Sequence, residues 1–282
     1  MELTNENYYS QEANVEYMSV SQFKQFQDCE VMAMAILKGE YVPEKNNGMK
    51  RGGYVDAFFS NELDKFMEEN QDMINSKTNE FKAPFKNIPA IIETIKNDPY
   101  FYSFHQGNVQ QIYTGVIAGV KVKGKLDFDF GETMTVDQKI MSDLGGKVWN
   151  DKKHRYEDFI EHFGYHIQGG VYQELKRQRL GVKAPHILAI TTDEEIPDKA
   201  LIEIDQEWLD SGLEEFEELA PRYDLIKKGV IEPVGCGRCP VCRKLKRLTK
   251  VQLYSQVFDK GELELLWKRK LKTKKLIKRK KL

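Results

Sequence analysis

The chain has 282 residues, of which 40% are hydrophobic and 11% aromatic, enough for a sizeable core, and this excludes an intrinsically disordered protein. Ten of its 43 basic residues lie in residues 268–282; without them 33 basic residues face 44 acidic ones, so the remainder carries about −11. The acidic amino terminus does not resemble a signal peptide and no apolar run could span a bilayer, which predicts a cytoplasmic protein without membrane contact.

The first predicted element is a helix over residues 18–40. Apolar residues recur near helical spacing in this segment, and Ser19 or Ser21 can cap its amino-terminal end. Cys29 lies inside the predicted helix. A single cysteine in such a place is usually a small buried apolar residue.

A second helix is predicted to begin at the pair Gly52-Gly53. Its apolar stripe leaves Asp56 to one side, so Asp56 taken alone is a surface residue. Residues 70–108 then predict a polar, helical insertion that three prolines interrupt, and we find no catalytic pattern in it.

Residues 111–119 and 120–130 predict a β-hairpin, and a third strand begins near Met134. In the second strand apolar residues alternate with Asp127 and Asp129, which is the period of a strand with one apolar face. The turn after this strand leads into a β-prone run that ends in Asp137, Gln138 and Lys139.

Asp127, Asp137 and Lys139 are the candidate catalytic group. Asp137 and Lys139 fall on the same face of their strand, and Asp127 lies near the end of the strand before it. Two carboxylates can hold a hard divalent cation, and a neighbouring ammonium can orient a water and stabilise phosphorane charge. The pattern predicts the metal site of a nuclease. The alternative is a solvated strand end, since an acid two residues before a lysine recurs by chance in a chain that is 31% charged.

A long helix is predicted over residues 156–179. Gln168 and Tyr172 lie one turn apart on one face of it. Gly169 and Gly170 cost about 1 kcal/mol each in a helix interior, which indicates close approach to the sheet or to a ligand.

The elements that follow are strands over residues 185–192 and 200–204 and a helix over residues 206–228. This order of helices and strands predicts an α/β fold.

The four cysteines of the chain are Cys29, Cys236, Cys239 and Cys242, and the last three follow one another at two-residue gaps. A disulfide framework is disfavoured in a cytoplasmic chain of this size, so metal binding is the better interpretation. Three closely spaced thiolates with one distant thiolate favour a four-iron, four-sulfur cluster, and zinc is the alternative. Either centre would join the first helix to the carboxy-terminal segment.

The order of these motifs resembles the PD-(D/E)XK nucleases of the RecB and RecE type, in particular phage-encoded exodeoxyribonucleases similar to exonuclease VIII. The resemblance runs through Gly52-x3-Asp56, Asp127, Asp137-Gln138-Lys139 and Gln168-x3-Tyr172, over residues 15–250. It implies a restriction-endonuclease-like core, a mixed central sheet flanked by helices, with a cysteine metal-cluster staple similar to that of AddB-type subunits.

In this family Asp127 and Asp137 would hold Mg²⁺ or Mn²⁺, and Lys139 would position or activate a water. Asp56 stands where the first motif usually ends in histidine. Gln168 and Tyr172 would contact DNA or brace the site. The resemblance further implies an exonuclease that resects double-stranded DNA ends in phage recombination beside a single-strand annealing protein, with the oligomeric state left open.

The expected organisation is an N-terminal arm over residues 1–17, a nuclease domain over residues 18–250 and a basic tail over residues 251–282. Two alternatives stay open: a non-catalytic DNA-binding module with a structural cysteine metal site, and a nuclease of CRISPR adaptation.

Overall fold

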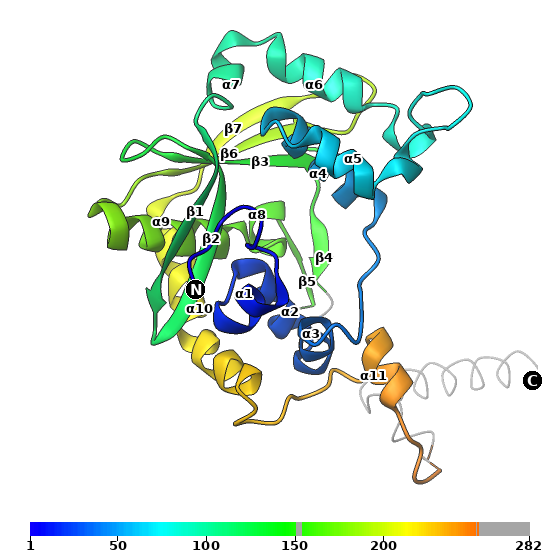
Figure 1. Cartoon of the computed structure of the whole chain (residues 1–282), viewed down its shortest axis with the longest axis vertical. Helices are drawn as coiled ribbons and strands as arrows, with labels where there is room; N and C mark the ends of the chain where they lie inside the picture. The colour runs from blue at the N-terminus through cyan, green and yellow to red at the C-terminus, as the bar shows by residue number, and fades with distance from the viewer. Residues whose placement is uncertain (151–153, 252, 254–282) are drawn as a thin grey trace, which may run out of the picture. The chain divides into compact units, whose positions relative to one another are not determined.

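The computed structural model describes residues 1–150, 154–251 and 253 (Figure 1). Contacts between Cα atoms divide the chain into two units, Met1–Cys242 and Arg243–Leu282. The fold and all the candidate site residues belong to the first unit. The basic residues 268–282 lie outside the described part of the chain.

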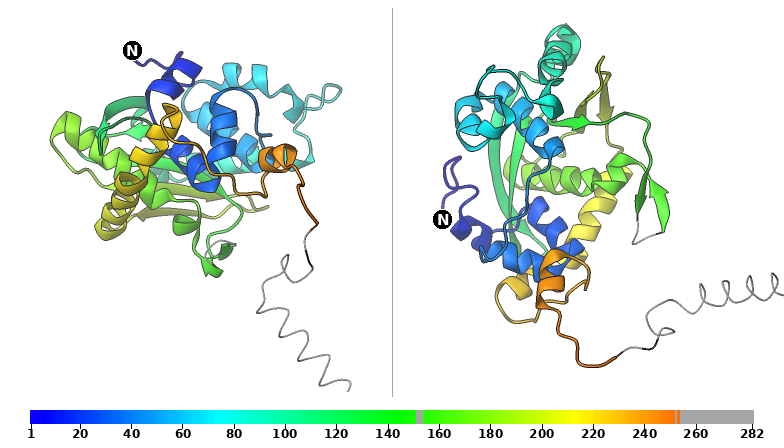
Figure 2. Two further views of the ribbon diagram at one scale, coloured as in Figure 1. Left: turned by 90° about the horizontal axis from the view of Figure 1, so that it is seen from below. Right: turned by 90° about the vertical axis from the view of Figure 1, so that its right-hand side faces the viewer.

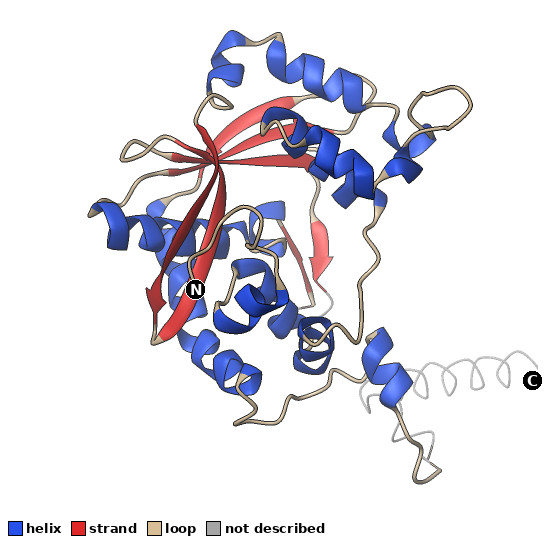
Figure 3. Ribbon diagram, in the orientation of Figure 1, coloured by secondary structure: helices blue, strands red, loops and turns tan. Residues whose placement is uncertain are grey.

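A five-stranded mixed sheet forms the centre of the first unit, as the sequence predicts (Figure 3). Its strands lie in the order β1-β2-β3-β6-β7, and β3 and β6 are the parallel pair while the other neighbours are antiparallel. The predicted hairpin and the three later strands are therefore confirmed. Their bounds are β1 Asn108–Ile117, β2 Val120–Asp129, β3 Thr135–Met141, β6 His186–Thr192 and β7 Lys199–Glu203.

Helices cover both faces of β3, β6 and β7 (Figures 1 and 2). Along β6, Ala189 packs into one hydrophobic cluster, while Leu188 and Ile190 pack into another, because successive side chains of a strand point to opposite faces. The first cluster belongs to α4 (Asn47–Phe59), α6 (Ile88–Lys96) and α7 (Pro99–Ser103), and the second to α8 (Phe159–His162) and α10 (Gln206–Lys227).

The β1–β2 hairpin extends beyond this layer and packs on a third cluster with α2 (Val20–Asp28), α9 (Tyr165–Leu180) and α10. Phe23 of α2 lies 4.6 Å from Phe216 and 5.4 Å from Tyr223 of α10, measured between ring centroids. The remaining elements are α1 Gln11–Glu16, α3 Glu30–Leu37, α5 Leu63–Glu69, the 3-10 turns Gln71–Met73 and Ala83–Phe85, β4 Val148–Asn150, β5 Arg155–Glu157 and α11 Pro240–Leu245.

The expected N-terminal arm contains α1 and packs within the first unit, where the Lys123 ammonium donates to the carbonyl oxygen of the buried Tyr8. No helix among the described residues is long and apolar enough to cross a membrane.

Two predicted helices differ in the structure. The helix expected over residues 18–40 is broken at Cys29, whose extended backbone (φ −167°, ψ 113°) separates α2 from α3. Ser19 does cap α2, accepting from the backbone N of Gln22. The helix expected over residues 156–179 is divided in the structure. Residues 155–157 form β5, α8 covers only Phe159–His162, and Gly164 at φ +62° separates α8 from α9.

The segment expected to be a polar insertion, residues 70–108, is polar only on its outer side. Ile88, Ile91 and Ile95 of α6 recur at three- and four-residue steps and are fully buried against the sheet. Met73, Phe85 and Phe101 join the same cluster. The segment is thus one cover of the central sheet.

Candidate active site

Asp137 and Lys139 lie side by side on β3, and their side chains form an ion pair, so the prediction that they share a face is confirmed. Asp137 is only 1% exposed. Burial would lower the pKa of Lys139, but the carboxylates of Asp137 and Asp127 outweigh it and raise that pKa above its usual range. The ammonium is therefore held in its charged form.

Asp127 comes from β2, the neighbouring antiparallel strand. The pairing of Phe128 with Val136 places it beside Asp137, and its Oδ2 accepts a hydrogen bond of 3.0 Å from the backbone N of Gln138. Burial, and then the negative charges of Asp137 and Asp56, raise the pKa of Asp127 well above its usual range. Burial also acts to raise the pKa of Asp137, but Lys139 reverses the shift. Burial and the neighbouring negative charges therefore disfavour the charged form of Asp127, whereas Lys139 favours the charged form of Asp137.

Asp56 approaches the pair from α4. Gln110, a residue of β1 with φ +52°, donates from Nε2 to both carboxylate oxygens of Asp56, at 3.2 and 3.3 Å. Burial raises the pKa of Asp56 to about 6; Lys125 and Lys139 act against the shift and Asp137 adds to it. Asp56 is thus electrostatically part of the site rather than an isolated surface residue.

Helix α9 closes the site from the other side. Gln168 donates from Nε2 to Asp137 Oδ1 over 2.9 Å, and the same nitrogen lies 3.4 Å from the Tyr172 hydroxyl. The resemblance implies that Tyr172 either contacts DNA or braces the site. Tyr172 is only 8% exposed, which favours the bracing role. Gly124 of β2 makes room for this ring, since a Cβ there would lie 2.8 Å from it.

Three residues near the site were not identified from the sequence. The Lys139 ammonium lies 5.2 Å from the Tyr165 ring centroid, and the Lys24 ammonium lies 5.6 Å from the same centroid and donates to the carbonyl oxygen of Phe163. Burial, followed by repulsion from Lys139, lowers the pKa of Lys24 to about 8. His186 is 1% exposed, and burial lowers its pKa to about 4 even though Asp137 acts in the opposite direction.

A buried polar network beside the site fixes α9 to the sheet, and no sequence pattern predicts it. Lys176 is fully buried and donates to Asp129 Oδ1 (2.7 Å), to the carbonyl oxygen of Met134 and to Thr135 Oγ1. The second carboxylate oxygen of Asp129 accepts from the Tyr113 hydroxyl at 2.8 Å. Because every polar group in this set has a partner, the network can orient Gln168 and Tyr172 on the same helix.

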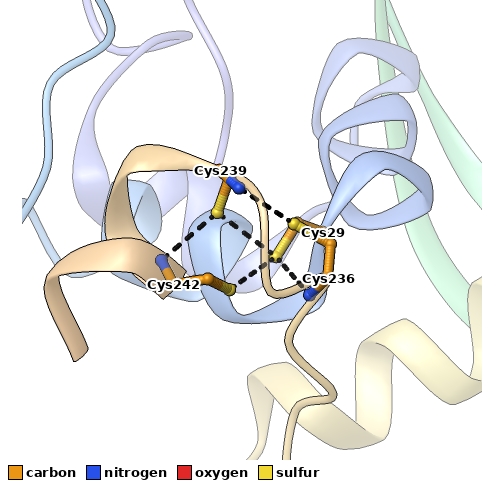
Figure 4. Close-up of side chains that lie close together, drawn as sticks. All are labelled: Cys29, Cys236, Cys239 and Cys242. Carbon is orange, nitrogen blue, oxygen red and sulfur yellow. Dashed lines mark hydrogen bonds between the residues drawn. The ribbon is translucent and has the colours of Figure 1, made fainter. Parts of the chain in front are cut away.

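The four cysteines meet at a separate place in the first unit (Figure 4). Their sulfur atoms all lie within 4.8 Å of one another, with Cys29 Sγ 3.6 Å from Cys242 Sγ and 3.7 Å from Cys239 Sγ. The predicted association of Cys29 with the later three cysteines is therefore confirmed. Such a group can hold a metal ion.

Comparison with known proteins agrees with this fold. A family model described as "PDDEXK-like domain of unknown function (DUF3799)" matches residues 19–245. A crystal structure from Eubacterium rectale, named "Putative exonuclease", shares 38% sequence identity and a TM-score of 0.87; the match covers 92% of this chain and 99% of that one. No curated protein matches the chain significantly.

Proposed function

The chain belongs to the PDDEXK-like family DUF3799, and from this premise we propose that it is a nuclease that hydrolyses phosphodiester bonds of DNA with a divalent cation. One observation carries the proposal: two carboxylates, Asp127 and Asp137, lie on neighbouring strands beside the charged Lys139 in a buried setting. Carboxylates brought together at such a cost in repulsion are suited to a hard cation.

Asp127 and Asp137 would hold Mg²⁺ or Mn²⁺, which when bound supplies positive charge to the phosphate and acidifies a water. The rest of the chemistry belongs to the chain. Lys139, kept protonated by Asp137, can donate to the attacking water or to a phosphate oxygen. Gln168 fixes the Asp137 carboxylate through Oδ1, and Tyr172 supports Gln168.

We propose further that the enzyme is an exonuclease acting on double-stranded ends. The support is the 38% identity with the protein from Eubacterium rectale that is named as an exonuclease. The expected role in phage recombination beside an annealing protein rests on the family resemblance alone.

The test is incubation of the purified protein with end-labelled linear DNA and with closed circular DNA, in Mg²⁺ and in EDTA. We expect loss of linear DNA only, and only with Mg²⁺. Asp127→Asn and Asp137→Asn should abolish cleavage while DNA binding persists, because each removes a ligand charge. Lys139→Ala should lower the rate by about a hundredfold or more.

The matched control is Asp143→Asn, an exposed aspartate just beyond β3, which should cleave as the wild type does. Near wild-type cleavage by Asp137→Asn would contradict the assignment of Asp137 as a metal ligand. Cleavage of circular DNA at the same rate as linear DNA would leave a nuclease but overturn the exonuclease.

A further inference from the structure

We propose that the four cysteines hold a single structural Zn²⁺. A tetrahedral zinc site with Zn–S bonds of about 2.3 Å has sulfur–sulfur edges of about 3.8 Å. The distances from Cys29 Sγ to Cys242 Sγ and Cys239 Sγ, 3.6 and 3.7 Å, match such an edge, and no pair of the four sulfurs is more than 4.8 Å apart.

The same distances disfavour the four-iron cluster that the cysteine spacing predicts. In that cluster each thiolate binds a different iron and points outward from the cube, so the sulfurs must lie farther apart than the irons do. Four thiolates that share one metal atom do lie as close together as these sulfurs do. The chemistry of an all-thiolate tetrahedral site then favours zinc.

The backbone around the cysteines is arranged to support thiolates. The N–H groups of Arg238 and Cys239 donate to Cys236 Sγ at 3.4 and 3.3 Å, and the N–H of Cys242 donates to Cys239 Sγ at 3.4 Å. Gly237, at φ +72°, makes the tight turn that aims these donors. Hydrogen bonds to sulfur favour the deprotonated form, which is the form that binds metal.

The position of the site indicates a structural ion rather than a catalytic one. Four protein ligands complete a tetrahedron and leave no position for a water or substrate. The ion would join the break between α2 and α3 to residues 236–242. Beside it, Glu30 pairs with Arg222 at 2.8 Å and accepts from the backbone N of Val234 at 2.7 Å. The zinc and Glu30 together would attach the carboxy-terminal segment to the helices. This structural role does not depend on the proposed nuclease activity.

The first experiment is elemental analysis of the full-length protein, purified anaerobically without added metal. We expect one zinc per chain, no iron or acid-labile sulfide, and no visible absorption. Exchange for Co²⁺ should produce the visible bands of a tetrahedral site and a thiolate charge-transfer band. Iron with sulfide, a single iron per chain, or four thiols that react freely in the folded protein would each overturn the proposal.

The second experiment uses variants. Cys236→Ser should lower the zinc content below one per chain and lower the Tm. Arg238→Ala is the matched control, because it keeps the backbone N–H that bonds Cys236 and should retain zinc and Tm. Full zinc content and an unchanged Tm in Cys236→Ser would contradict a four-thiolate site. Cys242 is buried, so a variant at this position would lose packing contacts as well as a ligand. The metal content of the wild-type protein tests the zinc site independently of any variant.

Discussion

His105 is a buried imidazole placed among aromatic rings. It is 3% exposed, and its ring centroid lies 5.2 Å from those of Phe59 and Phe101 and 5.1 Å from that of Phe128. Burial lowers the pKa of His105 to about 4, although the hydrogen bond with the Phe101 carbonyl oxygen acts against the shift. The fold therefore tolerates the neutral ring and opposes its protonation.

His105 should make stability fall on acidification. The unfolded chain binds this proton near pH 6.5 and the folded chain only near pH 4, so the contribution is constant above about pH 7 and is lost as the pH falls from 6.5 to 4. At about 1.4 kcal/mol per pKa unit, the loss is at most about 3.5 kcal/mol. His105→Phe should remove this part of the decline in urea unfolding measured from pH 7 to pH 4.5. An equal decline of the free energy of unfolding in the wild type and in His105→Phe would contradict this role of His105.

At the same scale, the sequence identifies those candidate site residues that are close in the chain or carry a motif. Asp127, Asp137 and Lys139 were predictable because strand alternation and one turn place them together. Lys24 and His186 were not, because each reaches the site from a distant element through tertiary packing, and nothing in their neighbouring residues signals it.

At the scale of elements, glycines set how closely α9 and α10 pack. A Cβ on Gly170 would lie 2.3 Å from the carbonyl oxygen of Leu209, and one on Gly212 would lie 2.5 Å from the carbonyl group of His166. Gly169 faces His186 of β6 and the Leu209 side chain. The close approach predicted for the glycine pair is therefore to α10 and the sheet.

Gly170→Ala should be strongly destabilising, because the atom in the way is backbone and cannot rotate aside. We expect a loss of about 1–3 kcal/mol or more in the free energy of unfolding, measured with urea. Gly52→Ala is the matched control: it is also helical, with no atom within 4 Å of the added Cβ, and should gain up to about 1 kcal/mol. Equal effects of the two substitutions would refute the steric explanation.

Two helices have bounds that differ from the predicted ones, and contacts with other parts of the chain again explain the difference. Residues 18–40 have helical periodicity throughout, yet Cys29 has an extended backbone that ends α2. Its sulfur lies beside three cysteines that follow more than 200 positions later in the chain. At residues 156–179, the strand β5 pairs with β4, and Gly164 turns the chain before α9. Local propensity decides an element only where no distant partner competes for its residues.

At the scale of the whole molecule, charge is unevenly distributed along the chain. The first 267 residues carry about −11, which would repel DNA, while residues 268–282 contain ten basic residues and no acidic one. Sequence-independent contacts between lysine or arginine and phosphate are the main source of non-specific DNA affinity. We therefore expect the basic tail to recruit the substrate, although it contains none of the proposed metal ligands.

Truncation before Lys268 should weaken duplex binding and flatten its salt dependence. Each neutralised phosphate contributes about −0.9 to the slope of log K against log salt, so engagement of about half of the ten charges predicts a slope smaller by about 4. A full-length variant with these lysines and arginines changed to glutamine should behave as the truncated protein does, which separates charge from length. The cleavage rate at saturating DNA should stay the same in all three proteins, since the tail would act on encounter and not on chemistry. Equal affinities and slopes on one duplex would leave the tail without a role in binding, and a lower rate at saturation would instead place it in the catalytic step.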